Sequence, residues 1–181
     1  DVGIAEETAA AIASGIAVNG GRPVWGVYST FVQRAYDQIS QDICINNSPA
    51  TIVTFSGSVY GMNDVTHLGL YDIPMLSNIP NLVYLAPTTK EEYLAMLDWS
   101  IEQITKDFSA LNKYEMTQQG KKVAFIGLGT FYSLAVEAAA ELEKKTGVKP
   151  TVINPYYITG TDEQMLEELK KEHDVVVTIE D

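Results

Sequence analysis

Short apolar runs that alternate with longer helical stretches constrain the fold of this chain more than any other feature. The runs are bounded by glycine, proline or polar residues and are rich in branched and aromatic side chains, as buried strands are. They cover residues 24–28, 50–55, 82–85, 122–127, 151–154 and 174–179. Helical patterns fill residues 5–19, 31–45, 88–103, 130–145 and 162–172. The repeated order of strand then helix predicts an α/β fold, with a parallel sheet and helices on both of its faces.

The spacing of these elements divides the chain. Residues 104–121 show no clear periodicity and are predicted to be a linker. We therefore expect one α/β domain over residues 1–103 and the first part of a second α/β domain over residues 122–181. Because the chain starts without methionine and stops on the strand-like residues 175–179, we expect it to belong to a longer polypeptide.

Charge and cysteine content narrow the class of partner. A net charge of −12 and a pI near 4.5 argue against nucleic acid or an anionic membrane as the main partner. Small phosphorylated ligands stay open, because a local basic pocket is enough to hold them. No apolar run is long enough for a membrane-spanning helix, no signal peptide is visible, and the single cysteine, Cys44, suits a reducing compartment. These features predict a cytoplasmic protein that acts on small molecules.

The first candidate for chemistry is Glu6. It opens the apolar, alanine-rich run of residues 5–18, where a charged side chain is exceptional. A carboxylate in such a setting is a candidate proton-transfer residue. The alternative is that Glu6 and Glu7 only favour the start of a helix through its macrodipole.

The second candidate is His67, one of two histidines. It lies in the polar, glycine-bearing loop of residues 56–69, which follows a predicted strand. Loops after parallel strands carry the sites of many α/β proteins. Imidazole can donate a proton to a substrate oxygen, or take one from it, near neutral pH. On its own, a loop histidine is also compatible with an ordinary surface position.

Two sequence blocks resemble a known family. Asp1-Val-Gly-Ile-Ala-Glu-Glu7 and the block Tyr28-Ser-Thr-Phe-Val-Gln-Arg-Ala-Tyr-Asp-Gln38 are similar to the pyrimidine-binding domain of the transketolase superfamily of thiamine diphosphate enzymes. Within it they are most similar to the 1-deoxy-D-xylulose-5-phosphate synthase family of isoprenoid biosynthesis. The resemblance implies that residues 1–103 are a pyrimidine-binding domain that lacks its first elements, and that residues 122–181 begin a transketolase C-terminal domain. It also implies that a strand is missing between residues 103 and 104.

The resemblance implies roles for particular residues. Glu6 would hydrogen-bond the pyrimidine ring nitrogen of the cofactor and promote loss of the thiazolium proton, and Phe31 would stack on the pyrimidine ring. Tyr28 and Ile4 would also contact the cofactor. Substrate contacts are implied for Tyr28, Arg34, His67 and Asn63. By this resemblance Glu6 and His67 are the catalytic residues.

The resemblance also implies cofactors and partners. Thiamine diphosphate is the implied cofactor, together with Mg²⁺. The family motif that binds Mg²⁺ and diphosphate is not in this sequence, so that part of the site belongs to a domain of the same longer chain or to a partner subunit. A homodimer is implied. The implied reaction is decarboxylation of pyruvate and condensation with glyceraldehyde 3-phosphate.

Departures from the family pattern keep other functions open. Asn63 replaces a family aspartate, and Asp64-Val65 replaces a Gly-Pro pair. Residues 55–58, Phe-Ser-Gly-Ser, replace Asp-Arg-Ala-Gly and so remove a substrate-contacting arginine. Because a guanidinium is well suited to phosphate, its loss favours a transketolase-like enzyme with a different donor or acceptor. Arg34 remains, although it could instead pair with a carboxylate such as Asp37.

Two further alternatives come from other classes of protein. One is a non-catalytic paralogue or assembly module. The joint presence of Glu6, Phe31 and His67 argues against it. The other is a nucleotide-binding module built on Gly127-Leu-Gly129, a weak signal because a third glycine is missing.

Overall fold

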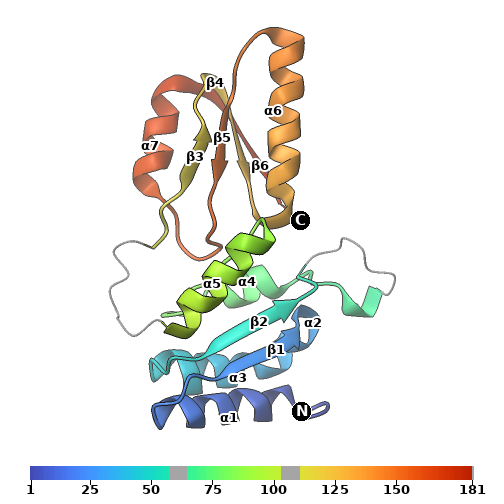
Figure 1. Cartoon of the computed structure of the whole chain (residues 1–181), viewed down its shortest axis with the longest axis vertical. Coiled ribbons are helices and arrows are strands. Elements are labelled where there is room, and N and C mark those ends of the chain that lie inside the picture. Colours follow the sequence, from blue (N-terminus) through green and yellow to red (C-terminus); the bar gives the residue numbers. More distant parts are fainter. Residues whose placement is uncertain (58–64, 103–110, 181) are drawn as a thin grey trace. The chain divides into compact units, whose positions relative to one another are not determined.

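The computed structural model describes residues 1–57, 65–102 and 111–180, which fall into two compact units (Figure 1). The first unit comprises Asp1–Leu82 and the described part of Ala95–Lys106. The second comprises Val83–Leu94 and the described part of Asp107–Asp181. The domain limits at residues 103 and 121 stay a prediction.

The first unit is built on two parallel strands, β1 (Val24–Tyr28) and β2 (Thr51–Phe55). Their register pairs Val24 with Thr51 at one end and Tyr28 with Phe55 at the carboxyl end. The described part of this unit also contains a 3₁₀ turn, Val65–His67, and the short helix α4 (Asp72–Leu76). Helix α5 (Lys90–Glu102) has residues in both units.

Helix α1 (Glu6–Val18) packs against β1 and against the helical segment of residues 29–45. Its buried positions include Ala10, Ala13 and Ala17. Because this spacing follows the helical repeat, these residues share one face, and Glu6 lies on the same face one turn earlier. The small alanine side chains allow a close approach of the neighbouring segment. The same periodicity therefore buries the Glu6 carboxylate.

The helix predicted over residues 31–45 is interrupted. The chain instead forms α2 (Ser29–Val32), a 3₁₀ turn (Gln33–Ala35), α3 (Tyr36–Gln38) and a π-helical segment (Ile39–Ile45). Side chains compete for the backbone in the π segment, because the Asp42 carbonyl accepts from Ser14 Oγ at 2.8 Å and from Asn46 Nδ2 at 3.1 Å. Such competition disturbs the regular helical ladder.

The second unit holds a sheet whose strand order is β3-β5-β4-β6. Its strands are β3 (Glu115–Gln118), β4 (Lys122–Gly127), β5 (Thr151–Asn154) and β6 (His173–Ile179). Strand β3 runs antiparallel to β5, and the other pairs are parallel. Since β3 lies within residues 104–121, the segment predicted as a linker is not irregular throughout.

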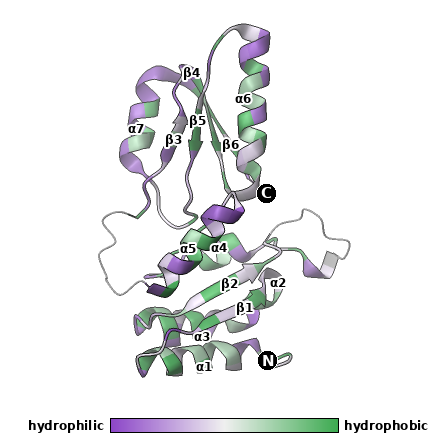
Figure 2. Ribbon diagram, viewed as in Figure 1, coloured by the Kyte–Doolittle hydropathy of each residue, from purple (hydrophilic) through white to green (hydrophobic). Residues whose placement is uncertain are grey.

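Helices cover both faces of this sheet. Phe125 and Val152 pack on α6 (Tyr132–Thr146), whereas Ala124 and Ile153 pack with α7 (Glu163–Glu172). Adjacent strand residues point to opposite faces, so α6 and α7 lie on opposite sides. In Figure 2 the apolar colour follows the inner strands, whereas the edge strand β3 is largely polar, and both helices carry polar residues. The predicted α/β fold with helices on both faces is confirmed.

The prediction of a strand over residues 82–85 is wrong. Only Leu85 forms a bridge there, with Tyr157. The Tyr84 N–H donates to the side chain of Thr159 at 3.0 Å, and Tyr156 has a φ of 58°. A left-handed residue beside the bridge prevents a regular ladder. Within the described residues, no helix has both the length and the apolar character needed to cross a membrane.

Candidate functional site

The candidate site lies in the first unit, at the carboxyl ends of β1 and β2. Tyr28 ends β1 and Phe55 ends β2, and their ring centroids lie 6.2 Å apart. Helix α2 starts immediately after Tyr28 and carries Phe31, whose ring lies 6.2 Å from that of Tyr28 at an interplanar angle of 82°. The carboxyl edge of parallel strands is where α/β proteins bind ligands.

His67 joins these aromatic rings. Its ring centroid lies 5.2 Å from that of Phe31 and 6.3 Å from that of Tyr28, in edge-to-face arrangements that aromatic pairs prefer. The Nδ1 atom of His67 is 2.8 Å from the Thr66 hydroxyl. The Thr30 hydroxyl donates to the Thr66 carbonyl at 3.3 Å and so ties the histidine-bearing turn to α2.

Glu6 and Arg34 connect helix α1 to the same cluster. Arg34 Nη1 lies 3.1 Å from Glu6 Oε2, and the Glu6 side chain is only 11% exposed whereas that of Arg34 is 44% exposed. The Arg34 guanidinium lies 5.4 Å from the centre of the Phe31 ring, within cation–π range. The carboxylate that pairs with Arg34 is therefore Glu6 and not Asp37.

Backbone packing beneath the cluster fixes the two loops that follow β1 and β2. The buried Ser29 hydroxyl donates to the Ser56 carbonyl at 3.0 Å. A Cβ on Gly69 would lie 2.7 Å from Gly57 Cα and even closer to the Ser29 hydroxyl. Only glycine at 69 therefore allows the chain to pass so near to the end of β2.

The structure brings together most of the residues predicted for the site. Glu6, Tyr28, Phe31, Arg34 and His67 form one connected set of contacts.

Ile4 and Asn63 are the other two residues predicted for the site. Ile4 is 84% exposed, and Asn63 lies outside the described residues. Phe55 was missed as a site residue, although its position opposite Tyr28 in the parallel register is the signal that would have found it. The functional roles of all these residues remain predictions. No group of three or more potential metal-ligating side chains occurs in the described ranges.

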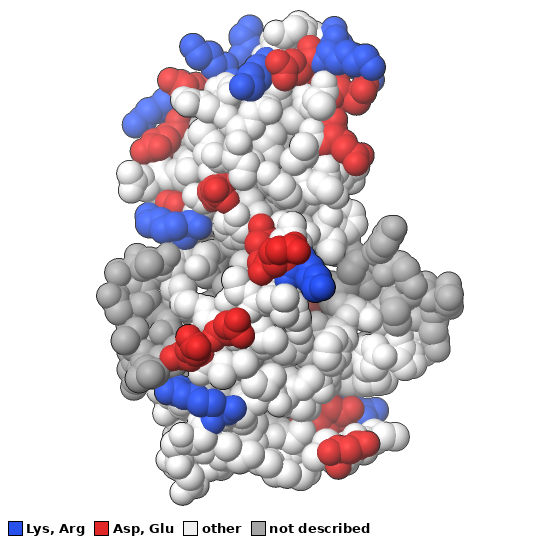
Figure 3. All heavy atoms as spheres, viewed as in Figure 1, with Lys and Arg blue, Asp and Glu red and all other residues white. Residues whose placement is uncertain are grey.

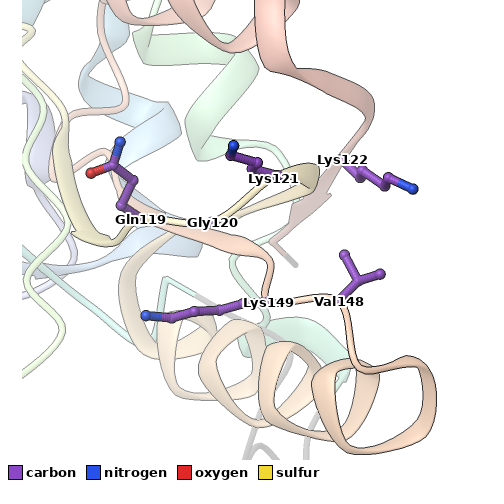
Figure 4. A pocket seen from close by; sticks show the side chains of 6 residues that line it. All are labelled: Gln119, Gly120, Lys121, Lys122, Val148 and Lys149. Carbon is purple, nitrogen blue, oxygen red and sulfur yellow. The ribbon is translucent and has the colours of Figure 1, made fainter.

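A separate hollow of about 590 Å³ lies in the second unit and is shown in Figure 4. It is lined by Gln119, Gly120, Lys121, Lys122, Val148 and Lys149. The lysine side chains in Figure 4 point in different directions and do not converge on one point. Figure 3 shows lysine or arginine side chains interspersed with acidic ones on the second unit. The hollow therefore has no defined polar arrangement comparable to the Glu6 cluster.

Solved structures share this fold. A split-gene transketolase, described as an inactive β4 tetramer, matches with a TM-score of 0.85 at 23% identity, covering 99% of this chain and 64% of that chain. A Pichia stipitis transketolase in complex with sedoheptulose 7-phosphate matches with a TM-score of 0.78 at 20% identity, covering 97% of this chain and 29% of that chain. The fold is thus the one that transketolases adopt.

Sequence comparison gives the family. The transketolase pyrimidine-binding domain matches residues 1–113, and the transketolase C-terminal domain matches residues 112–181. The chain therefore belongs to the transketolase family.

Curated relatives carry a more specific name. The chain is 36% identical to a 1-deoxy-D-xylulose-5-phosphate synthase from Clostridium botulinum (strain Alaska E43 / Type E3) over 199 aligned residues, which is 100% of this chain and 32% of the relative. It is 37% identical to a 1-deoxy-D-xylulose-5-phosphate synthase from Alkaliphilus oremlandii (strain OhILAs), again over 100% of this chain and 32% of the relative. The chain spans about a third of the length of these relatives, 32% in both cases.

Proposed function

We propose that the protein containing this chain is a thiamine diphosphate-dependent transferase of the 1-deoxy-D-xylulose-5-phosphate synthase type. It decarboxylates pyruvate and transfers the remaining two-carbon unit to an aldose phosphate such as glyceraldehyde 3-phosphate. The observation that carries the proposal is the buried Glu6 carboxylate, which is held by Arg34 beside the Phe31 ring. The relatives named as this synthase support the choice of reaction.

The residues present fit the aminopyrimidine half of the cofactor. One Glu6 oxygen, Oε2, is bound by Arg34, and no hydrogen bond to the other oxygen, Oε1, occurs among the described residues. A carboxyl group in this position can share a proton with the ring nitrogen of a flat heterocycle, and the Phe31 ring that Arg34 also contacts can pack against that heterocycle. Glu6 would hold that nitrogen, while Phe31 and Tyr28 would provide apolar contact. When bound, thiamine diphosphate supplies a nucleophilic carbon and an electron sink for decarboxylation.

His67 is assigned to the substrate side of the site. If the Thr66 hydroxyl donates to Nδ1, the proton of the neutral imidazole is on Nε2. That N–H donates to a substrate oxygen and stabilises the charge that develops there. The Tyr28 and Phe31 rings lie edge-to-face with His67 and would provide apolar contact beside a bound substrate.

The described residues provide no cluster of metal ligands, so we assign Mg²⁺ and the diphosphate group to another domain. That domain belongs either to the same longer chain or to a partner subunit. We further propose a homodimer in the cytoplasm, and the single buried Cys44 is compatible with a reducing compartment.

A transketolase-like enzyme with another donor or acceptor is the second candidate. Ser56 occupies the position where the synthase family has an arginine, and Arg34, the remaining guanidinium among the described site residues, is paired with Glu6. Both features weaken the case for a phosphorylated acceptor. A non-catalytic paralogue is the third candidate, and it predicts no turnover with any donor.

Substitution of Glu6 tests the proposed function. In the full-length protein with thiamine diphosphate and Mg²⁺, we expect Glu6→Gln and Glu6→Ala to lower turnover of pyruvate by about 10²-fold or more, the scale of general acid–base catalysis. The exposed neighbour Glu7 provides the control, since Glu7→Gln changes the charge by the same amount but leaves the pair of Glu6 and Arg34 intact. Circular dichroism checks that each variant is folded. Near-normal turnover in Glu6→Gln would refute the assignment.

A further inference from the structure

Arg34 contacts two proposed cofactor-binding residues at the same time. Its Nη1 atom binds Glu6 Oε2 at 3.1 Å, and its guanidinium carbon lies 5.4 Å from the centre of the Phe31 ring. The three residues come from three elements: α1, α2 and the 3₁₀ turn Gln33–Ala35. Arg34 is therefore the link between the helix that carries the carboxylate and the helix that carries the aromatic ring.

We propose that Arg34 is a positioning residue that sets the orientation of Glu6 and Phe31 towards the aminopyrimidine, and that it is not the residue that binds a substrate phosphate. This inference rests on the proposed function. In place of the substrate contact that the resemblance implies, Arg34 acts indirectly, through Glu6 and Phe31.

Local backbone geometry explains why Arg34 reaches both partners. Phe31 and Arg34 are three residues apart, and the chain changes from α to 3₁₀ geometry at Gln33. Side chains three residues apart lie on the same face in both α and 3₁₀ geometry, which favours contact between the guanidinium and the ring. Helix α1 packs against this turn, so the first turn of α1 lies within reach of the same guanidinium.

The ion pair restricts the Glu6 carboxylate. A glutamate side chain has several rotatable bonds, and a charge-assisted hydrogen bond to one oxygen limits its conformations. Because Arg34 takes Oε2, the carboxylate presents Oε1, which has no hydrogen bond among the described residues. Pre-arranging this oxygen reduces the entropy that is lost when the cofactor binds.

Charge balance argues against direct phosphate binding by Arg34. The guanidinium is already paired with a carboxylate that is only 11% exposed. A phosphate that competed for Arg34 would leave that carboxylate without its partner and would lie close to its negative charge. Unpaired buried charges are costly, so the paired arrangement is favoured.

The test compares Arg34→Met, Arg34→Lys and the control Asp37→Asn in the full-length protein. The control removes an exposed charge close to Arg34 in sequence that forms no ion pair with it. Two constants are measured for each variant: the dissociation constant of thiamine diphosphate, from quenching of intrinsic fluorescence at fixed Mg²⁺, and the KM for the aldose phosphate, from steady-state kinetics. Thermal unfolding confirms that the variants are folded.

We expect Arg34→Met to raise the cofactor dissociation constant about tenfold and to lower kcat, while the KM for the aldose phosphate stays within about twofold. Arg34→Lys keeps a positive charge to pair with Glu6 but loses the planar guanidinium and its several N–H donors. Its dissociation constant for thiamine diphosphate should therefore be intermediate. Asp37→Asn should match the wild type in both constants.

Three outcomes overturn the inference. A tenfold rise in the acceptor KM with unchanged cofactor binding would make Arg34 a substrate contact. No change in either constant would leave Arg34 without a role in the site. A wild-type protein that does not bind thiamine diphosphate would refute the proposed function itself, and it is recognised before any variant is compared.

Discussion

Replacement of Asp162 by alanine should destabilise the second unit strongly. Asp162 is 5% exposed and caps helix α7. Its carboxylate accepts from the Met165 N–H at 3.2 Å and the Tyr114 N–H at 3.1 Å, and it pairs with the Lys113 ammonium at 3.4 Å. One side chain thus joins the start of α7 to the segment that leads into β3.

The expected loss follows from these contacts. Removal of a helix N-cap costs about 1 kcal/mol. Leaving the Tyr114 N–H without an acceptor costs about 1–3 kcal/mol more, and the mostly exposed Lys113 contributes at most about 1 kcal/mol. The free energy of unfolding should therefore fall by about 3 kcal/mol in Asp162→Ala. For a unit of this size, the melting temperature should fall by roughly 12–24 °C.

The dependence on pH provides a second signature. Burial by itself raises the pKa of Asp162, but the hydrogen bonds from Tyr114 and Met165 and the charge of Lys113 outweigh burial and hold the pKa below its ordinary value of 3.8. The folded state therefore favours the carboxylate. Its contribution is fully present above the ordinary carboxyl pKa and is lost as pH falls through the lowered value.

Thermal unfolding followed by circular dichroism tests both points. The gap in melting temperature between the wild type and Asp162→Ala should be constant from pH 7 to 5 and should narrow below about pH 4. Asp162→Asn, which keeps an oxygen for the cap, should lose less stability than alanine. A loss below about 1 kcal/mol in Asp162→Ala, or a gap that widens in acid, would refute the reasoning.

Three other substitutions or measurements test the structure at separate places. Gly69→Ala should abolish most activity while the second unit keeps its stability, because the new methyl would lie 2.7 Å from the loop backbone after β2; normal kcat would contradict this packing. Thr151→Val should lower the free energy of unfolding, measured by urea titration, by about 1–3 kcal/mol. The reason is that the buried Thr151 hydroxyl accepts from the Gly120 N–H at 3.0 Å and lies 2.7 Å from His173 Nε2. Thr151→Ser keeps the hydroxyl and should retain most of the stability. Burial raises the pKa of the Cys44 thiol to about 11, so iodoacetamide at pH 8 should label the native protein slowly and the urea-denatured protein fast; equal rates would show that the thiol is accessible.

Much of the fold was predictable because it follows from local periodicity. The runs at residues 24–28 and 122–127 form strands with the same bounds in the structure. The candidate cluster was also predictable, since Tyr28 and Phe31 flank the carboxyl end of a predicted strand. Strand ends in parallel sheets converge, which makes side chains that follow them neighbours.

The parts that sequence could not predict depend on tertiary contacts. The pairing of Arg34 with Glu6 requires helix α1 to pack beside the 3₁₀ turn, and no local signal distinguishes it from a pair with Asp37. The irregular segment at residues 82–85 depends on Thr159, which is distant in sequence and supplies a side-chain acceptor to the backbone. The break in the helix over residues 31–45 likewise depends on Ser14 of another helix.

Release of CO₂ from pyruvate by the full-length protein is the most direct test of the proposed function. The assay contains thiamine diphosphate and Mg²⁺ and is run with and without glyceraldehyde 3-phosphate. The proposal predicts CO₂ release that depends on the aldehyde. No release from a protein shown to bind the cofactor would contradict it, and would direct the search to hydroxypyruvate and ketose phosphates as donors.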